Sequence, residues 1–149
     1  MPQSLAVVHL HLVFSTKHRR PLLADHGLRD RTHSYLGAVC AERNSPPVRV
    51  GGVADHVHML CRLGRTIAIA DLVRDAKRAS SGWLKEQGIA DFDWQDGYGG
   101  FGVSPGHVPA LVAYIENQEN HHRTETFQDE FRRILKKNGA VHDERYVWD

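Results

Sequence analysis

The positions of the apolar residues predict an α+β protein in which strands alternate with helices. Alternating apolar side chains indicate a strand over Ala6–Phe14, because successive side chains of a strand point to opposite faces. The runs Val48–Val53 and His56–Leu63 have the same β-branched, apolar character. Within 91–103 several glycines lie close together, and this segment is expected to form either an irregular strand or a hinge.

Apolar residues that recur every three or four positions predict four helices. They are expected over Leu23–Glu42, Ile69–Gln87, Pro105–His121 and Thr126–Asn138. The resulting order is β-α-β-β-α-β-α-α. This order predicts one domain, 1–149, with a ferredoxin-like (RRM-like) antiparallel sheet, helices packed on one face, and the first and third strands as central neighbours.

Composition and charge narrow the class of protein. A chain of 149 residues with 41% hydrophobic and 25% charged residues is typical of one globular domain. No apolar run could cross a membrane and no signal-peptide pattern is present, so we expect a cytoplasmic protein. Cys40 and Cys61 are expected to be buried free thiols. The formal charge of +1 argues against indiscriminate nucleic-acid binding but allows a local basic groove.

Two His-x-His pairs are the first candidates for chemistry. His56 and His58 lie in one predicted strand, and His9 and His11 in another. Both imidazoles of a pair point to the same face of a strand, and imidazole is a common ligand of divalent transition metals. From these patterns alone, either pair could bind the metal, support the ligands of the other, or lie on an exposed face.

Basic residues gather in two places. They are Lys17, Arg19 and Arg20 in the loop after the first strand, and Arg74, Lys77 and Arg78 on one face of the 69–87 helix. Such residues can contact DNA phosphates, although a charged helix face is commonly only solvated.

Tyr114 and Gln118 are spaced one helical turn apart at the edge of an apolar stripe, with His121 on the same flank. The helix therefore presents a phenol and an amide together. A tyrosine at a core boundary also fits this pattern without any catalytic role.

Several segments together resemble the single-tyrosine HUH transposases, the TnpA-like enzymes of the smallest bacterial insertion sequences. The similar stretches are HLVFSTKHRRPLL, GGVADHVHML, DLVRDAKRASSGWL, WQDGYGGFGVS and YIENQENHHRTETFQDEF, and the closing DERYVWD also resembles the end of the family. They cover nearly the whole chain in the order of the family. The resemblance implies the HUH endonuclease fold.

The resemblance also implies roles for particular residues. His56 and His58 would be the metal ligands of the HUH motif, Gln118 the third ligand, and Tyr114 the nucleophile. The enzyme would cleave and rejoin single-stranded DNA beside a subterminal hairpin through a 5′-phosphotyrosine, using Mg²⁺ or Mn²⁺. It would act as a homodimer, with Tyr114 of one subunit able to serve the metal site of the other. Three further histidines are candidates to support the ligands, namely His9, His11 and His121. His9 and His11 lie outside the motif of the family, but the predicted strand order places them beside His56 and His58, where they could support the ligands or face the substrate.

Other functions remain open at the level of sequence. A domesticated enzyme of the same superfamily would process chromosomal hairpin repeats with the same chemistry. A non-catalytic ferredoxin-like module would bind nucleic acid through exposed aromatic residues on its central strands, where this chain has histidines. A metal-dependent phosphoesterase would activate water and would not need Tyr114.

Overall fold

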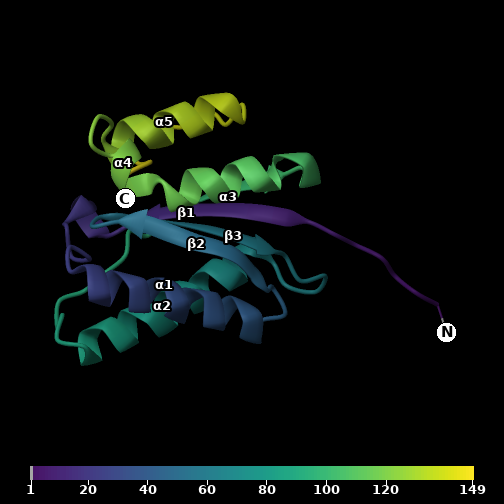
Figure 1. Ribbon diagram of the computed structural model, residues 1–149, viewed down its shortest axis with the longest axis horizontal. Helices are drawn as coiled ribbons and strands as arrows, with labels where there is room; N and C mark the ends of the chain where they lie inside the picture. The colour runs from purple at the N-terminus through teal and green to yellow at the C-terminus, as the bar shows by residue number, and fades with distance from the viewer. Residues whose placement is uncertain (1) are drawn as a thin grey trace.

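The computed structural model describes residues 2–149, and its centre is a four-stranded antiparallel sheet (Figure 1). The strands are β1 (His9–Ser15), β2 (Pro47–Val53), β3 (His56–Arg62) and β4 (Gly99–Val103). They lie in the order β2-β3-β1-β4, so that β1 and β3 are the central neighbours. This arrangement confirms the predicted ferredoxin-like class. The glycine-rich segment forms an edge strand.

Helices lie on both faces of this sheet. On one face are α1 (His26–Glu42) and α2 (Ile69–Glu86), as Figure 1 shows below the strands. On the other are α3 (Val108–Glu116), α4 (Gln118–His121) and α5 (Phe127–Lys137). Short 3₁₀ turns, η1 (Lys17–Arg19) and η2 (Pro105–His107), precede α1 and α3. The predicted class described helices on one face only, so the C-terminal helices add a layer to it.

The alternation of side chains along β1 and β3 separates two cores. Leu12, Phe14 and Met59 belong to the larger cluster beneath α1 and α2. The opposite face of β1 contributes Val13 to a smaller cluster with Phe131 and other residues of α5. The histidines of β1 and β3 share this second face, because they alternate with the residues of the larger core. They therefore lie between the sheet and the C-terminal helices.

Two glycines allow the C-terminal helices to approach the sheet closely. A Cβ atom on Gly51 of β2 would lie 2.7 Å from the side chain of Ile115 in α3. A Cβ atom on Gly99 of β4 would lie 2.6 Å from the ring of Phe131 in α5. Both distances are too short for real atoms, so any side chain at either position would push its helix away from the sheet.

The chain ends by packing against α5. Trp148 contacts the rings of Phe127 and Phe131 at centroid distances of 6.4 and 6.1 Å. The amide of Gly97 donates a 2.8 Å hydrogen bond to the carbonyl of Asp149. Cys40 and Cys61 are buried free thiols, as predicted. None of the helices within residues 2–149 combines the length and the apolar character needed to cross a membrane.

Candidate metal and nucleophile site

His56 and His58 lie near the start of β3 and are both fully buried. Their ring centroids are 5.1 Å apart, and both rings lie on the face of the sheet that the C-terminal helices cover. The intervening Val57 enters the larger core on the other face. The strand therefore fixes the backbone through Val57 while it directs two imidazoles into one small volume.

The carboxylate of Glu130, on α5, occupies the centre of this volume. Its Oε1 atom lies 3.1 Å from Nε2 of His56 and 3.0 Å from Nε2 of His58. Its Oε2 atom accepts hydrogen bonds from the hydroxyl of Tyr114 and, at 2.9 Å, from Nε2 of Gln118. Glu130 is fully buried, so these polar partners take the place of solvent.

Gln118, on α4, also contacts His56 and Glu130. Its side-chain oxygen lies 3.0 Å from Nε2 of His56, and the residue is 1% exposed. Ligand atoms of His56, His58 and Glu130 all lie within 4.8 Å of one another. Two imidazole nitrogens, a carboxylate oxygen and an amide oxygen thus converge, and this mixed set of donors fits a divalent ion.

Both histidines have a partner on the ring nitrogen that faces away from the centre. Nδ1 of His56 lies 2.7 Å from Oδ1 of Asp55, and Nδ1 of His58 lies 2.9 Å from Nε2 of His11. An ion on Nε2 requires the hydrogen on Nδ1, and each of these partners can accept it. Such partners fix the orientation of metal-binding imidazoles in other proteins.

The pKa values of the histidines at the site are set by burial and by hydrogen bonds to nearby carboxylates. Burial lowers the pKa of His56, but hydrogen bonds to Asp55 and Glu130 outweigh it and raise the pKa to about 9. Burial lowers the pKa of His58, and it lowers that of His11 to about 3. His56 is therefore the protonated histidine at neutral pH, and its positive charge offsets the buried carboxylate.

Tyr114 extends from α3 toward the same centre. Its ring lies 5.8 Å from that of His58, and its hydroxyl is also contacted by Nη2 of Arg133 at 2.9 Å. Burial, followed by the hydrogen bond to Glu130, raises the pKa of Tyr114 above its ordinary value. The helix ends two residues later, at Glu116, and Asn117 turns the chain into α4. Tyr114 and Gln118 nevertheless reach the same carboxylate.

Sequence reasoning did not find Glu130, although the sequence contains a signal for it. Phe127, Phe131 and Ile134 form the apolar stripe of α5, and Glu130 occupies a position on that same stripe. A carboxylate on the buried face of a helix requires polar partners. In this chain the partners are the groups of the candidate site.

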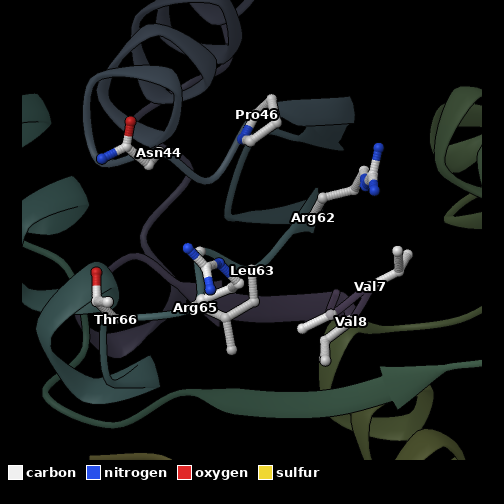
Figure 2. A pocket seen from close by; sticks show the side chains of 10 residues that line it. Val7, Val8, Asn44, Pro46, Arg62, Leu63, Arg65 and Thr66 are labelled. Atoms are coloured by element: carbon white, nitrogen blue, oxygen red, sulfur yellow. The ribbon is translucent and has the colours of Figure 1, made fainter. Parts of the chain in front are cut away.

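The site is closed to solvent. Gln118, Glu130 and both histidines are at most 1% exposed. A surface hollow of about 520 Å³ lies beside them, and its lining includes Asp55, His122 and Phe127. His122 also lies 3.1 Å from Oε1 of Glu130, so the hollow adjoins the centre. A second hollow of about 330 Å³, at the other end of β1 and β3, is lined by Val8, Arg62 and Arg65 among others (Figure 2).

The structure places the remaining predicted histidines differently. His11 contacts His58, whereas His9 pairs with Arg62 at the far end of the sheet and does not adjoin the site. His121 hydrogen-bonds to Glu125 at the edge of the site.

Most of the six predicted DNA-binding side chains have partners within the protein. Arg20 pairs with Asp91 at 2.8 Å, and Lys17 lies 3.8 Å from Asp96. Arg74 pairs with Asp71 at 3.1 Å.

Lys77 and Arg78, both on α2, differ from each other in this respect. The ammonium of Lys77 donates to the carbonyl oxygens of Gln95, Asp96 and Gly97, and burial lowers its pKa to about 8. This lysine therefore holds a loop in place. Arg78 is exposed and forms no ion pair within residues 2–149, while Arg19 lies over the ring of Trp148. Arg19 and Arg78 are thus the two of the six that form no hydrogen bond or ion pair through their side chains among residues 2–149.

Comparisons with known proteins identify the family and the fold of the chain. A family model described as "Transposase IS200 like" matches residues 4–118. A Deinococcus radiodurans R1 protein, described as a candidate transposase, is 23% identical with a TM-score of 0.64, covering 79% of this chain and 95% of that one. A REP-associated tyrosine transposase bound to a REP hairpin is 14% identical with a TM-score of 0.60, covering 82% of this chain and 74% of that one. No curated protein matches the chain significantly.

Proposed function

Because this chain belongs to the IS200-like transposase family, we propose that it cleaves and rejoins single-stranded DNA through a covalent link to Tyr114. The observation that carries the proposal is the position of the Tyr114 hydroxyl. It shares the carboxylate of Glu130 with His56, His58 and Gln118, so a nucleophile and a set of metal ligands meet at one point.

The proposed metal ligands are His56, His58 and Gln118, to which the buried carboxylate of Glu130 adds a fourth. Nitrogen and oxygen donors together suit Mg²⁺ or Mn²⁺, and we favour these ions over zinc. When bound, the ion would supply Lewis-acid polarisation of the phosphate oxygens. Asp55 and His11 would orient the two imidazoles toward it.

The phenol of Tyr114 would carry out the covalent step. Its oxygen forms a bond to the phosphorus, the bond from phosphorus to the 3′ oxygen breaks, and that oxygen leaves as a 3′-hydroxyl after taking up a proton. The phenolic proton is released to solvent. The DNA is then held as a 5′-phosphotyrosine, so the 3′-hydroxyl of another strand can reverse the step without a nucleotide cofactor.

The proposed substrate is single-stranded DNA beside a hairpin. The similarity in fold to a protein solved with a REP hairpin is compatible with it. Arg19 and Arg78, whose guanidinium groups form no ion pair with a carboxylate among residues 2–149, are proposed to contact the phosphates. We also propose a homodimer. Each chain contains a Tyr114 close to its own histidines, so a shared site would require α3 to move.

The test is a covalent-adduct assay. Purified protein, Mn²⁺ and labelled single-stranded DNA from both flanks of its own gene are resolved on a denaturing gel. We expect a protein–DNA band that is absent for Tyr114→Phe and for His56→Ala. Lys85→Ala, at an exposed position of α2 on the far face of the sheet, is the matched control and should retain the band. An adduct that persists in Tyr114→Phe would refute the assignment of the nucleophile.

The same assay separates the other functions. Cleavage without an adduct would indicate a phosphoesterase that activates water, and DNA binding without cleavage would indicate a binding module. A domesticated repeat-processing enzyme would form the adduct with chromosomal hairpin repeats and not with the flanks of its gene.

A further inference from the structure

The hydroxyl of Tyr114 has two partners, and both come from α5. Glu130 accepts its hydrogen bond from the buried side, and Nη2 of Arg133 lies 2.9 Å from the same oxygen on the outer side. The guanidinium carbon is 5.7 Å from the centre of the phenol ring. Residues three apart on a helix share a face, so one turn of α5 presents an anion and a cation to one oxygen.

Arg133 is held in this position by the loop that precedes α5. Its Nε and Nη2 atoms each lie 3.1 Å from one of the two carboxylate oxygens of Glu125. Nη2 also lies 3.0 Å from Nε2 of His121. Two parallel bonds to one carboxylate fix the plane of a guanidinium, and its orientation toward Tyr114 is therefore set before any substrate arrives.

The two partners would have opposite effects on a negative charge at the Tyr114 oxygen. Glu130 is fully buried and, as a carboxylate, has no proton to donate. The side chain of Arg133 is 47% exposed, so it borders the open side of Tyr114. Negative charge on the phenol oxygen would be opposed by Glu130 and stabilised by Arg133.

We propose that Arg133 is a catalytic residue that stabilises the negative charge on the Tyr114 oxygen when the phosphotyrosine link is broken. The inference rests on the proposed function and adds a residue to it. In the joining step, the 3′-hydroxyl oxygen of the acceptor strand bonds to the phosphorus and releases its proton to solvent. The bond from phosphorus to the Tyr114 oxygen breaks, and its electron pair returns to that oxygen. Arg133 donates a hydrogen bond to this leaving group as its charge develops.

The experiment measures joining separately from cleavage. Covalent adduct is first accumulated with a DNA whose cleaved 3′-hydroxyl strand is short enough to diffuse away. An acceptor strand with a 3′-hydroxyl is then added with Mn²⁺, and release of protein from DNA is followed with time. We expect Arg133→Met to release the protein on the order of 100-fold more slowly than wild type, the cost typical of removing one donor to a developing charge. Arg133→Lys keeps a cation and should recover part of the rate.

Arg132→Met is the matched control. Its guanidinium binds Asp129 and Glu144 and lies over Trp148, away from Tyr114. This variant should join at the wild-type rate. Melting temperature and affinity for uncleaved DNA should be the same for Arg133→Met and wild type. If Arg133 only stabilised the fold, its replacement would instead lower the melting temperature.

The outcomes distinguish this inference from the proposal on which it rests. Wild-type joining by the Arg133→Met adduct, or an equal loss in Arg132→Met, would overturn the role of Arg133 and leave the tyrosine chemistry intact. Failure of the wild-type protein to form any adduct would overturn the proposed function and this inference with it.

Discussion

At the scale of single residues, a proton on His56 occupies the place proposed for the metal. Nδ1 of His56 faces Asp55 and Nε2 faces Glu130, so the protonated ring donates to a carboxylate on each side. A metal ion would replace the proton on Nε2. Metal binding should therefore release a proton, and its affinity should rise with pH.

This exchange predicts opposite effects of pH on the stability of the metal-free protein and on the stabilisation that a metal ion adds. The pKa of His56 is about 9 in the folded protein and 6.5 for an unperturbed histidine. Its contribution to the stability of the metal-free protein is fully present below pH 6.5 and is lost as the pH rises through 9. The melting temperature measured in EDTA should fall across this range, whereas the increase caused by Mn²⁺ should grow.

The variant Asp55→Asn, compared with the wild-type protein, tests whether His56 causes this pH dependence. It keeps the shape of the side chain but removes one of the two carboxylates that raise the pKa of His56. The fall in EDTA should then end at lower pH and be smaller than in the wild-type protein. A melting temperature in EDTA that is constant from pH 6.5 to 9 would contradict the assigned protonation of His56.

Single residues also show which contacts of the candidate site could be predicted from the sequence alone. The alternation of β3 sufficed to predict that His56 and His58 share a face, because the period of a strand is independent of the rest of the fold. The contact of His11 with His58 could be predicted only from the expectation that β1 and β3 are neighbours in the sheet. Glu130 could not be paired with the histidines in advance, because the sequence does not say which face of the sheet α5 covers.

At the scale of elements, the position of α5 depends on the absence of a side chain in β4. Phe131 packs directly over Gly99, and Glu130 precedes Phe131 on the same helix. Any displacement of α5 at this contact would move the carboxylate relative to His56 and His58. The edge strand thus contributes to the site without supplying a ligand.

Gly99→Ala should therefore weaken both the fold and metal binding. The added Cβ would lie 2.6 Å from the Phe131 ring, and overpacking of this kind costs about 1–3 kcal/mol. Gly102→Ala, on the same strand, is the control because no atom lies within 4 Å of its added Cβ. Thermal melts and Mn²⁺ titration calorimetry should show losses for Gly99→Ala only. Equal behaviour of the two variants would mean that α5 can shift without affecting the site.

The elements predicted best were those with a regular pattern. The amphipathic stripe predicted α2 to within one residue, at Ile69–Glu86. The expected helix over Pro105–His121 is instead a 3₁₀ turn followed by α3 and α4, with a turn at Asn117. Side-chain periodicity continues through such a turn, since Tyr114 and Gln118 still reach one carboxylate. The pattern therefore predicted that Tyr114 and Gln118 lie together, but it did not predict the interruption of the helix at Asn117.

At the scale of the whole molecule, the candidate site is assembled from distant segments and then covered. β3 supplies the histidines, α3 and α4 supply Tyr114 and Gln118, and α5 supplies Glu130. The C-terminal Trp148 packs against Phe127 and Phe131 of the same helix. All of this lies on one face of the sheet, and the larger core with α1 and α2 lies on the other. The site face can consequently change its packing without disrupting the main core.

The proposed chemistry requires such a change. The four proposed ligands are at most 1% exposed, so the present packing of α5 blocks direct access of a DNA phosphate from that side. Because α5 also carries Glu130 and Arg133, we expect it to open transiently from the sheet to admit DNA and then to close again over the site. Each opening would break contacts of the smaller core and expose the backbone amides of α5 more often. Hydrogen exchange of Tyr114→Phe, which cannot form the covalent link, should show faster exchange in α5 when Mn²⁺ and hairpin-bearing single-stranded DNA are added. Exchange in α2 on the opposite face should be unchanged. Equal or slower exchange of α5 at saturating DNA would mean that the phosphate enters by another route, and the hollow beside Asp55 and His122 would then be the path to test.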